Sequence, residues 1–146
     1  MRRLRKFLAL PPTRRRLFFR VWGTLLKWRL RLWFTPFSRW RDHLLSPGGL
    51  GEQKTDNSGA LQNTVWAITR AGRYLPGATC LVRTLAAREI LAEKGLSVEL
   101  RIGVAHDEGG KFEGHAWLEH EGRVVLGNPD DATRFVPLPL LLQRRQ

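Results

Sequence analysis

The spacing of apolar residues changes at Gly95, and this change constrains the fold more than any other feature of the sequence. Before Gly95, apolar residues such as Leu81 and Leu85 recur at steps of three and four, as on one face of a helix. After it, apolar and polar residues alternate from Ser97 to Val104, which predicts a half-buried strand. Glycine suits the position just after a helix C-terminus, so the pattern predicts a helix over residues 79–94.

Strand signals fill most of the chain after this point. Glu121-Gly122 is typical of a tight turn between two strands, and Pro137 favours an edge strand, because proline cannot donate a ladder hydrogen bond. The further strands are predicted at residues 113–120, 123–127 and 134–138. A second amphipathic helix is expected at residues 61–75. Two helices followed by an antiparallel sheet of three or four strands predict an α+β fold.

The N-terminal third differs from the rest of the chain in charge. Of the 25 Lys and Arg residues, 13 lie in residues 1–45, where Asp42 is the one acidic residue, so this third carries the whole net charge of +12. Nine of the 14 aromatic residues lie there too. We therefore expect a basic, aromatic arm joined to an electrically neutral globular part.

A helix is predicted within this arm, with Thr13 as its N-cap and Pro36 at its end. Its apolar stripe consists of Leu17, Val21, Leu25, Trp28 and Leu32. A second short helix is predicted at residues 38–45. The polar, glycine-rich segment that follows reads as a linker. The chain thus divides into an arm (1–45), a linker (46–60) and a globular domain (61–146).

Charges exclude a membrane-spanning helix at residues 17–34, because each charge at mid-bilayer costs about 3 kcal/mol. The apolar run Phe7–Leu10 is too short for a signal peptide, and Pro11 interrupts it. One cysteine excludes an internal disulfide and fits a reducing compartment. We therefore expect a cytoplasmic protein whose basic arm could associate with a membrane surface.

The single cysteine, Cys80, falls in the first turn of the predicted helix 79–94. Unpaired amides and the positive end of the helix dipole favour a thiolate there, which is the nucleophilic form. His115 lies on the predicted strand 113–120 and could pair with the thiolate and then protonate a leaving amine. The alternative is structural: a small buried Cys80 and a packed His115.

A third polar residue is expected on the strand after His115. If Glu121-Gly122 is a two-residue turn, counting back from it places His115 opposite Asn128. Facing Cβ atoms lie about 5 Å apart, so Asn128 could orient the imidazole, as an amide or carboxylate does in catalytic triads. Asp130 or Asp131 could take this role if the strand is bulged or shorter.

The sequence gives no sign of a bound cofactor or metal ion. It contains no phosphate-binding glycine loop, and one cysteine argues against a cysteine-rich zinc site. We expect no nucleic-acid binding either, because positive charge and aromatic residues alone are unspecific signals.

Three blocks of the sequence closely resemble a known family. They are Arg70–Leu81, which ends in the Pro76-Gly77-Ala78-Thr79-Cys80 run, then Leu100–Val104, then Phe112–Glu119 with its His115-Ala116-Trp117 run. The pattern resembles the transglutaminase-like B protein of lasso-peptide biosynthesis, in its stand-alone leader-peptidase form. The resemblance covers residues 62–140.

This resemblance implies a papain/transglutaminase-like cysteine-protease fold, with removal of the leader from a ribosomally made precursor as the activity. By motif, Cys80 matches the nucleophile and His115 the base. The family's third residue is usually an aspartate on the next strand, where this chain has Asn128, with Asp130 and Asp131 just beyond. The implied partners are the precursor peptide, a leader-recognition protein and a macrolactam-forming cyclase.

Two other functions stay open at this stage. The same thiol could pass its acyl group to an amine instead of water. A non-catalytic adaptor is the alternative of another class: its basic arm would hold biosynthetic partners or an anionic membrane. For the arm itself, the simplest interpretation is a helix packed on its own domain.

Overall fold

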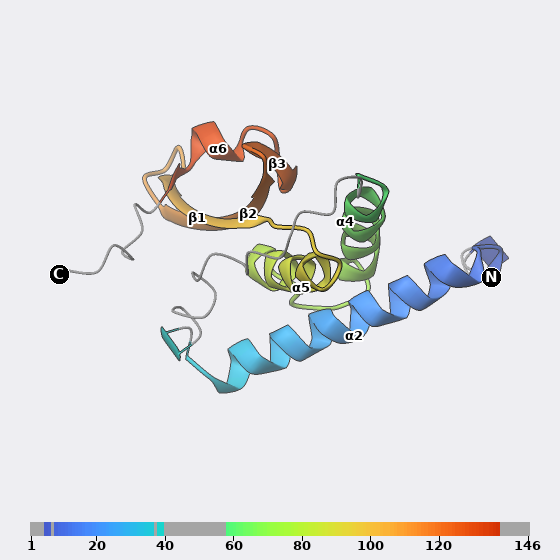
Figure 1. Ribbon diagram of the computed structural model, residues 1–146. Helices are drawn as coiled ribbons and strands as arrows, with labels where there is room; N and C mark the ends of the chain where they lie inside the picture. The colour runs from blue at the N-terminus through green and yellow to red at the C-terminus, as the bar shows by residue number, and fades with distance from the viewer. Residues whose placement is uncertain (1–4, 7, 37, 40–57, 138–146) are drawn as a thin grey trace.

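The computed structural model describes residues 5–6, 8–36, 38–39 and 58–137, and it has the α+β class that the sequence predicts. Within these residues, three long helices lie on one side of an antiparallel sheet, and a short helix lies on the other side (Figure 1). In chain order the elements are α2 (Pro12–Phe34), α4 (Ser58–Gly72), α5 (Cys80–Glu93), β1 (Glu99–His106), β2 (Phe112–His120), β3 (Arg123–Leu126), α6 (Asp131–Arg134) and β4 (Val136–Pro137).

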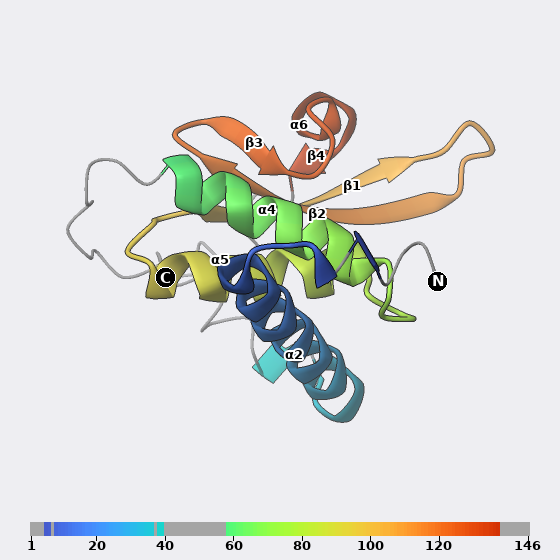
Figure 2. The ribbon, with the colours of Figure 1, turned by 90° about the vertical axis from the view of Figure 1, so that its right-hand side faces the viewer.

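The sheet has the order β3-β2-β1-β4, so β1 and β2 are its central strands. Their pairing is regular along its whole length, from Glu99 opposite Glu119 to His106 opposite Phe112. Strand β4 pairs with β1 at the edge, as expected for a strand that contains Pro137. Figure 2 shows α5 running alongside the two central strands.

Backbone conformation explains two of the chain reversals. Gly95 follows α5 with a φ of 76°, in the left-handed region where glycine carries no steric cost, and this confirms the predicted helix end. Glu121 and Gly122 have φ values of 49° and 75°, as in the two-residue turns that suit the twist of a hairpin. The predicted turn between β2 and β3 is therefore confirmed.

Helix α2 is longer than the apolar stripe that predicts it. It begins at Pro12, with Pro11 in the N-cap position, so the prediction of Thr13 as N-cap is wrong. Proline fits the first helical position because its fixed φ is already helical and its missing N–H would have no partner there. The helix ends before Thr35, which is extended with a φ of −127°, as the residue preceding Pro36 must be.

The stripe on α2 packs against α4 and α5, so of the readings left open for the arm, this helix follows the simplest one. Val21, Leu25 and Trp28 are at most 5% exposed and join one core with α4, α5 and the near face of the sheet. None of the helices within the described residues has the length and the apolar run needed to cross a membrane.

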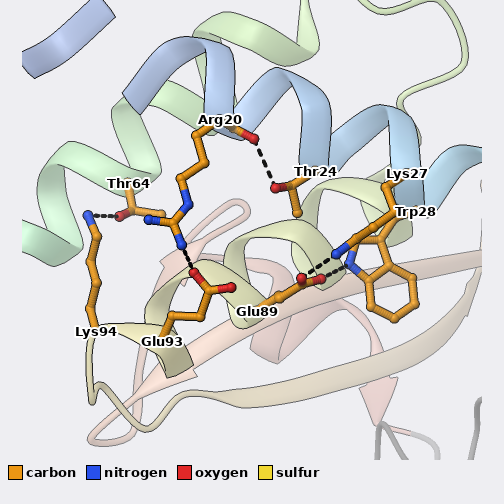
Figure 3. Close-up of polar contacts among 8 residues, drawn as sticks. All are labelled: Arg20, Thr24, Lys27, Trp28, Thr64, Glu89, Glu93 and Lys94. Carbon is orange, nitrogen blue, oxygen red and sulfur yellow. Dashed lines mark hydrogen bonds and ion pairs between the residues drawn. The ribbon is translucent and has the colours of Figure 1, made fainter. Parts of the chain in front are cut away.

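Polar contacts orient α2 across α5 (Figure 3). The indole Nε1 of Trp28 donates to Glu89 Oε2 at 2.6 Å, and the ammonium of Lys27 pairs with the same carboxylate. Two turns earlier on α2 and one turn later on α5, Arg20 pairs with Glu93. These exposed and half-exposed pairs add little energy individually, but the Trp28 contact specifies how α2 is rotated about its axis.

The division into arm, linker and domain stays a prediction. Nearly all of the expected linker 46–60 lies outside the described residues, and so does most of the short helix expected at residues 38–45. What the structure adds is that α2, within the arm, shares a core with the helices that follow the linker.

Replacing Leu25 by alanine should destabilise the protein by about 2–5 kcal/mol, because the buried side chain leaves a cavity between α2 and α5. Leu30→Ala is the matched control, since Leu30 lies on the same helix but is 46% exposed. Urea unfolding followed by circular dichroism measures both. Equal losses of stability in the two variants would contradict the packing of α2 described above.

Candidate active site

Cys80 is the first residue of α5 and is half-buried. Thr79 caps the helix: its Oγ1 accepts a hydrogen bond from the N–H of Val82 at 3.4 Å. Threonine at this position satisfies one of the amides that a helix start leaves unpaired. The sequence prediction that the cysteine lies at a helix N-terminus is therefore confirmed.

The loop before Cys80 is held by α2 and by its own hydrogen bonds. Thr79 N–H donates to the carbonyl of Gly77 at 2.9 Å, and Gly77 has a φ of 77°. The guanidinium of Arg29, on α2, lies so close to Gly77 that a Cβ added there would be 3.0 Å from its Nε. The positive φ favours glycine here, and the contact with Arg29 brings the N-terminal helix to the loop that carries the thiol.

His115 is the fourth residue of β2 and is half-buried among aromatic rings. Its imidazole lies 4.9 Å from the ring of Phe135 and is stacked on Trp117 at 6.2 Å, measured between ring centroids. Trp117 is fully buried, and its Nε1 donates to Glu119 Oε1 at 2.9 Å. These two rings limit how the imidazole can turn, and they shield one side of it from water.

Gly103 makes room for this aromatic cluster. It lies opposite His115 in the sheet, and an added Cβ would be 2.8 Å from both Phe135 Cβ and Trp117 Cη2. Neither Gly103 nor Phe135 was identified from the sequence as part of the site. A glycine inside an alternating strand does indicate close approach of another group, but no sequence signal shows that Phe135 returns to this position.

The alternation of β2 puts His115 and Trp117 on one face of the sheet and Leu118 on the other. Leu118 belongs to the core shared with α5, so the imidazole faces away from that core. Strand β3 pairs with β2 only as far as Leu118. Within the described residues, the part of β2 that carries His115 therefore has no strand on that side, and it forms an open edge of the sheet.

The predicted pairing of His115 with Asn128 is wrong. His120 does face Arg123, but a bulge between Leu118 and Glu119 moves the next pair to Leu118 opposite Leu126, where the ladder ends. The extra residue in β3 shifts the register by one residue. Asn128 is therefore no longer the residue opposite His115. Asn128 lies instead in the turn after β3.

Asn128 and Asp130 form the exposed turn that starts α6. The Oδ1 of Asn128 accepts from the N–H of Asp130 at 3.3 Å, and the carbonyl of Asp130 accepts from the N–H of Arg134 at 2.9 Å. Arg134 then pairs with Glu113 at 2.7 Å. This ion pair, together with the ring contact between Phe135 and His115, holds the turn and α6 over the histidine's face of the sheet.

The structure thus brings the candidate residues to adjacent elements. Helix α5, which starts at Cys80, packs against β2, which carries His115, and α6 follows directly from the turn of Asn128 and Asp130. A catalytic role for these four residues stays a prediction. Among the described residues, no cluster of three or more His, Cys, Asp or Glu side chains could hold a metal ion.

Gly103→Ala should destabilise the protein by about 1–3 kcal/mol, because the added methyl group forces Phe135 and Trp117 apart. Gly114→Ala is the matched control one position before His115: its Cβ would meet nothing within 4 Å. Urea unfolding of both variants tests this. A Gly103→Ala variant as stable as the Gly114→Ala variant would contradict the close packing behind His115.

Comparison with known proteins supports the fold assignment. The family described as the transglutaminase-like superfamily matches residues 23–139, a span that begins within α2 and includes α4, α5 and all four strands of the sheet. No curated protein and no solved structure matches the chain significantly. The family match covers well over half of the chain and agrees with the helices and the antiparallel sheet described above. The chain therefore belongs to the transglutaminase-like superfamily.

Proposed function

We propose that this protein is a cysteine peptidase that removes the leader from a ribosomally made lasso-peptide precursor. The observation that carries the proposal is the position of Cys80: the single cysteine of a transglutaminase-like chain is the first residue of a capped helix that packs on the strand of His115. The likeness of the sequence blocks around Cys80 and His115 to the lasso-peptide B proteins supports the choice of substrate.

The reaction would pass through an acyl-thioester. The Cys80 thiolate attacks the carbonyl carbon of the scissile bond, and His115 gives its proton to the amine of the core peptide as the C–N bond breaks. The leader is then held through its C-terminal carbonyl on sulfur. His115 removes a proton from water, the hydroxide attacks the thioester, and the leader leaves as a carboxylic acid while the thiolate is regenerated.

Backbone amides at the start of α5 are the candidates for the oxyanion site. The N–H of Val82 already donates a hydrogen bond to Thr79 Oγ1. The N–H of Arg83 donates to the backbone carbonyl of Thr79. Of the two amides before them, that of Cys80 is the first choice for binding the negative oxygen of the tetrahedral intermediate, because it belongs to the attacking residue. A fixed donor of this kind contributes about 100- to 1,000-fold to the rate in other acyl-transfer enzymes.

The open edge of β2 supports an approach between the two groups. His115 faces away from the core that α5 shares with the sheet, so a thiol and an imidazole could meet only around a strand edge. The early end of β3 at Leu126 leaves such an edge beside His115. Asn128 or Asp130 would orient the imidazole from the turn that follows β3.

The remaining parts of the proposal rest on the resemblance. A cytoplasmic leader-recognition protein would present the precursor peptide, and the cyclase would close the ring on the released core. No cofactor takes part in this scheme, because the thiol, the imidazole and water supply every atom and proton that moves.

Cys80→Ala and His115→Ala should each lower leader cleavage by about a thousandfold or more, because each removes a reacting group. His106→Ala is the control, since His106 is an exposed histidine at the end of β1. The assay is co-expression with the precursor and its partner proteins, followed by mass spectrometry of the peptides. Circular dichroism verifies that the variants fold. Normal cleavage by a folded Cys80→Ala protein would contradict the proposal.

Cleavage in H₂¹⁸O distinguishes hydrolysis from transfer to an amine. Hydrolysis predicts one ¹⁸O atom in the C-terminal carboxylate of the released leader, because water attacks the thioester. An amide-linked leader without the label would show that the same thiol serves an acyl transferase.

A further inference from the structure

Helix α2 has a second apolar face, which points away from the protein. We call it the outer stripe and define it as Phe19, Leu30, Trp33 and Phe34. These side chains are 62%, 46%, 72% and 78% exposed, respectively. Large apolar side chains scattered over a surface need no explanation, but four on one helix form a patch of the kind that marks an interaction site.

The spacing of the outer stripe is helical. Leu30 lies three turns after Phe19, and Trp33 and Phe34 follow Leu30 by three and four residues. Gly23, one turn after Phe19, has open space where its Cβ would be. The buried stripe of Val21, Leu25 and Trp28 faces α4 and α5, so α2 presents one apolar face to the core and another to the outside.

Cations border the outer stripe on both sides. Arg16, Arg20 and Lys27 follow one flank at helical spacing, and Arg15 and Arg29 follow the other. Helix α2 contains seven Lys and Arg residues and no Asp or Glu. Two of these cations, Arg20 and Lys27, pair with carboxylates of α5. Because α2 itself carries no acidic residue, the outer face stays positively charged.

The shape of this surface favours a lipid bilayer over a folded partner. Helix α2 lies along one side of the molecule as a convex rod, with the other elements on its inner side (Figures 1 and 2). At 1.5 Å per residue its 23 residues span about 35 Å. A bilayer surface can meet the whole of such a rod, whereas a folded partner would need a matching concave surface of the same length.

The chemistry of the stripe favours the same choice. Exposed tryptophan and phenylalanine between rows of arginine is the pattern of helices that lie in the plane of the membrane interface. The aromatic rings enter the boundary between headgroups and acyl chains, and the long cationic side chains reach the phosphates. We infer that α2 docks by its outer stripe, lying flat, on an anionic lipid bilayer.

Flotation of the full-length protein with vesicles tests this inference. Binding should be at least about tenfold stronger to vesicles with about 30% phosphatidylglycerol than to phosphatidylcholine alone. It should weaken about tenfold between about 0.1 M and about 0.5 M NaCl, because salt screens the attraction of the arginines. Equal binding to the neutral vesicles, or no binding to the anionic ones, would overturn the inference.

Substitutions distinguish docking by the outer stripe from nonspecific binding to vesicles. Trp33→Ala combined with Phe34→Ala should lower binding to the anionic vesicles at least about tenfold, because two interfacial anchors are lost. Arg16→Gln should weaken it to a smaller degree. The control is Phe112→Ala, an aromatic residue on β2 that is 63% exposed and lies away from the outer stripe. Circular dichroism verifies the fold of each variant.

Other occupants of the stripe would give different results. A second copy of the chain predicts a dimer by light scattering without lipid, which the Trp33→Ala/Phe34→Ala variant converts to monomer. An acidic partner protein predicts retention on that partner without flotation. Either result, or a double variant that floats like the unmodified protein, contradicts docking on lipid.

Discussion

Burial of α5 on two sides is the interaction on which the rest of the molecule depends. Half of this 14-residue helix is buried, and it contacts α2 and α4 on one side and β1 and β2 on the other. The buried residues are Val82, Thr84, Leu85, Ala86, Ala87, Ile90 and Leu91. Small alanine side chains let the neighbouring elements approach closely, and the large ones fill the space between them. Without α5, helices α2 and α4 and the near face of the sheet would lose the core that they share.

The proposed role of Cys80 as a nucleophile fits this arrangement. The body of the helix cannot shift, because it is packed on both sides, whereas its N-terminus emerges at the end of the core with Cys80 half-buried. The loop before it is held in turn, by the Thr79 cap and by Arg29 against Gly77. A nucleophile benefits from this combination of a rigid position and partial access, since reacting groups must be aligned before substrate arrives.

Much of the fold could be predicted from local patterns, and less of the site. Helix and strand periods gave the α+β class, and glycine geometry gave the end of α5 and the β2–β3 turn, because these depend on neighbouring residues. The residue opposite His115 could not be predicted. One bulge beside Leu118 changes the pairing register of β2 and β3, and no local sequence pattern indicates this bulge. The ring contact between Phe135 and His115 depends on β2 meeting a segment 20 residues later in the chain, and the short α6 has too few residues for a period.

The two apolar faces of α2 show the same limit from another side. The apolar stripe predicted from the sequence period is the face that packs, but the period gave no sign that other apolar residues of α2 form a second, exposed face. Tertiary contacts make the distinction: Trp28 donates to Glu89, and Lys27 and Arg20 pair with carboxylates of α5. A helix rotated by half a turn would break these contacts and bury the outer stripe instead. The cations of α2 therefore have two roles: Arg20 and Lys27 help to set the rotation of the helix, and together with Arg15 and Arg16 they border the face that this rotation leaves exposed.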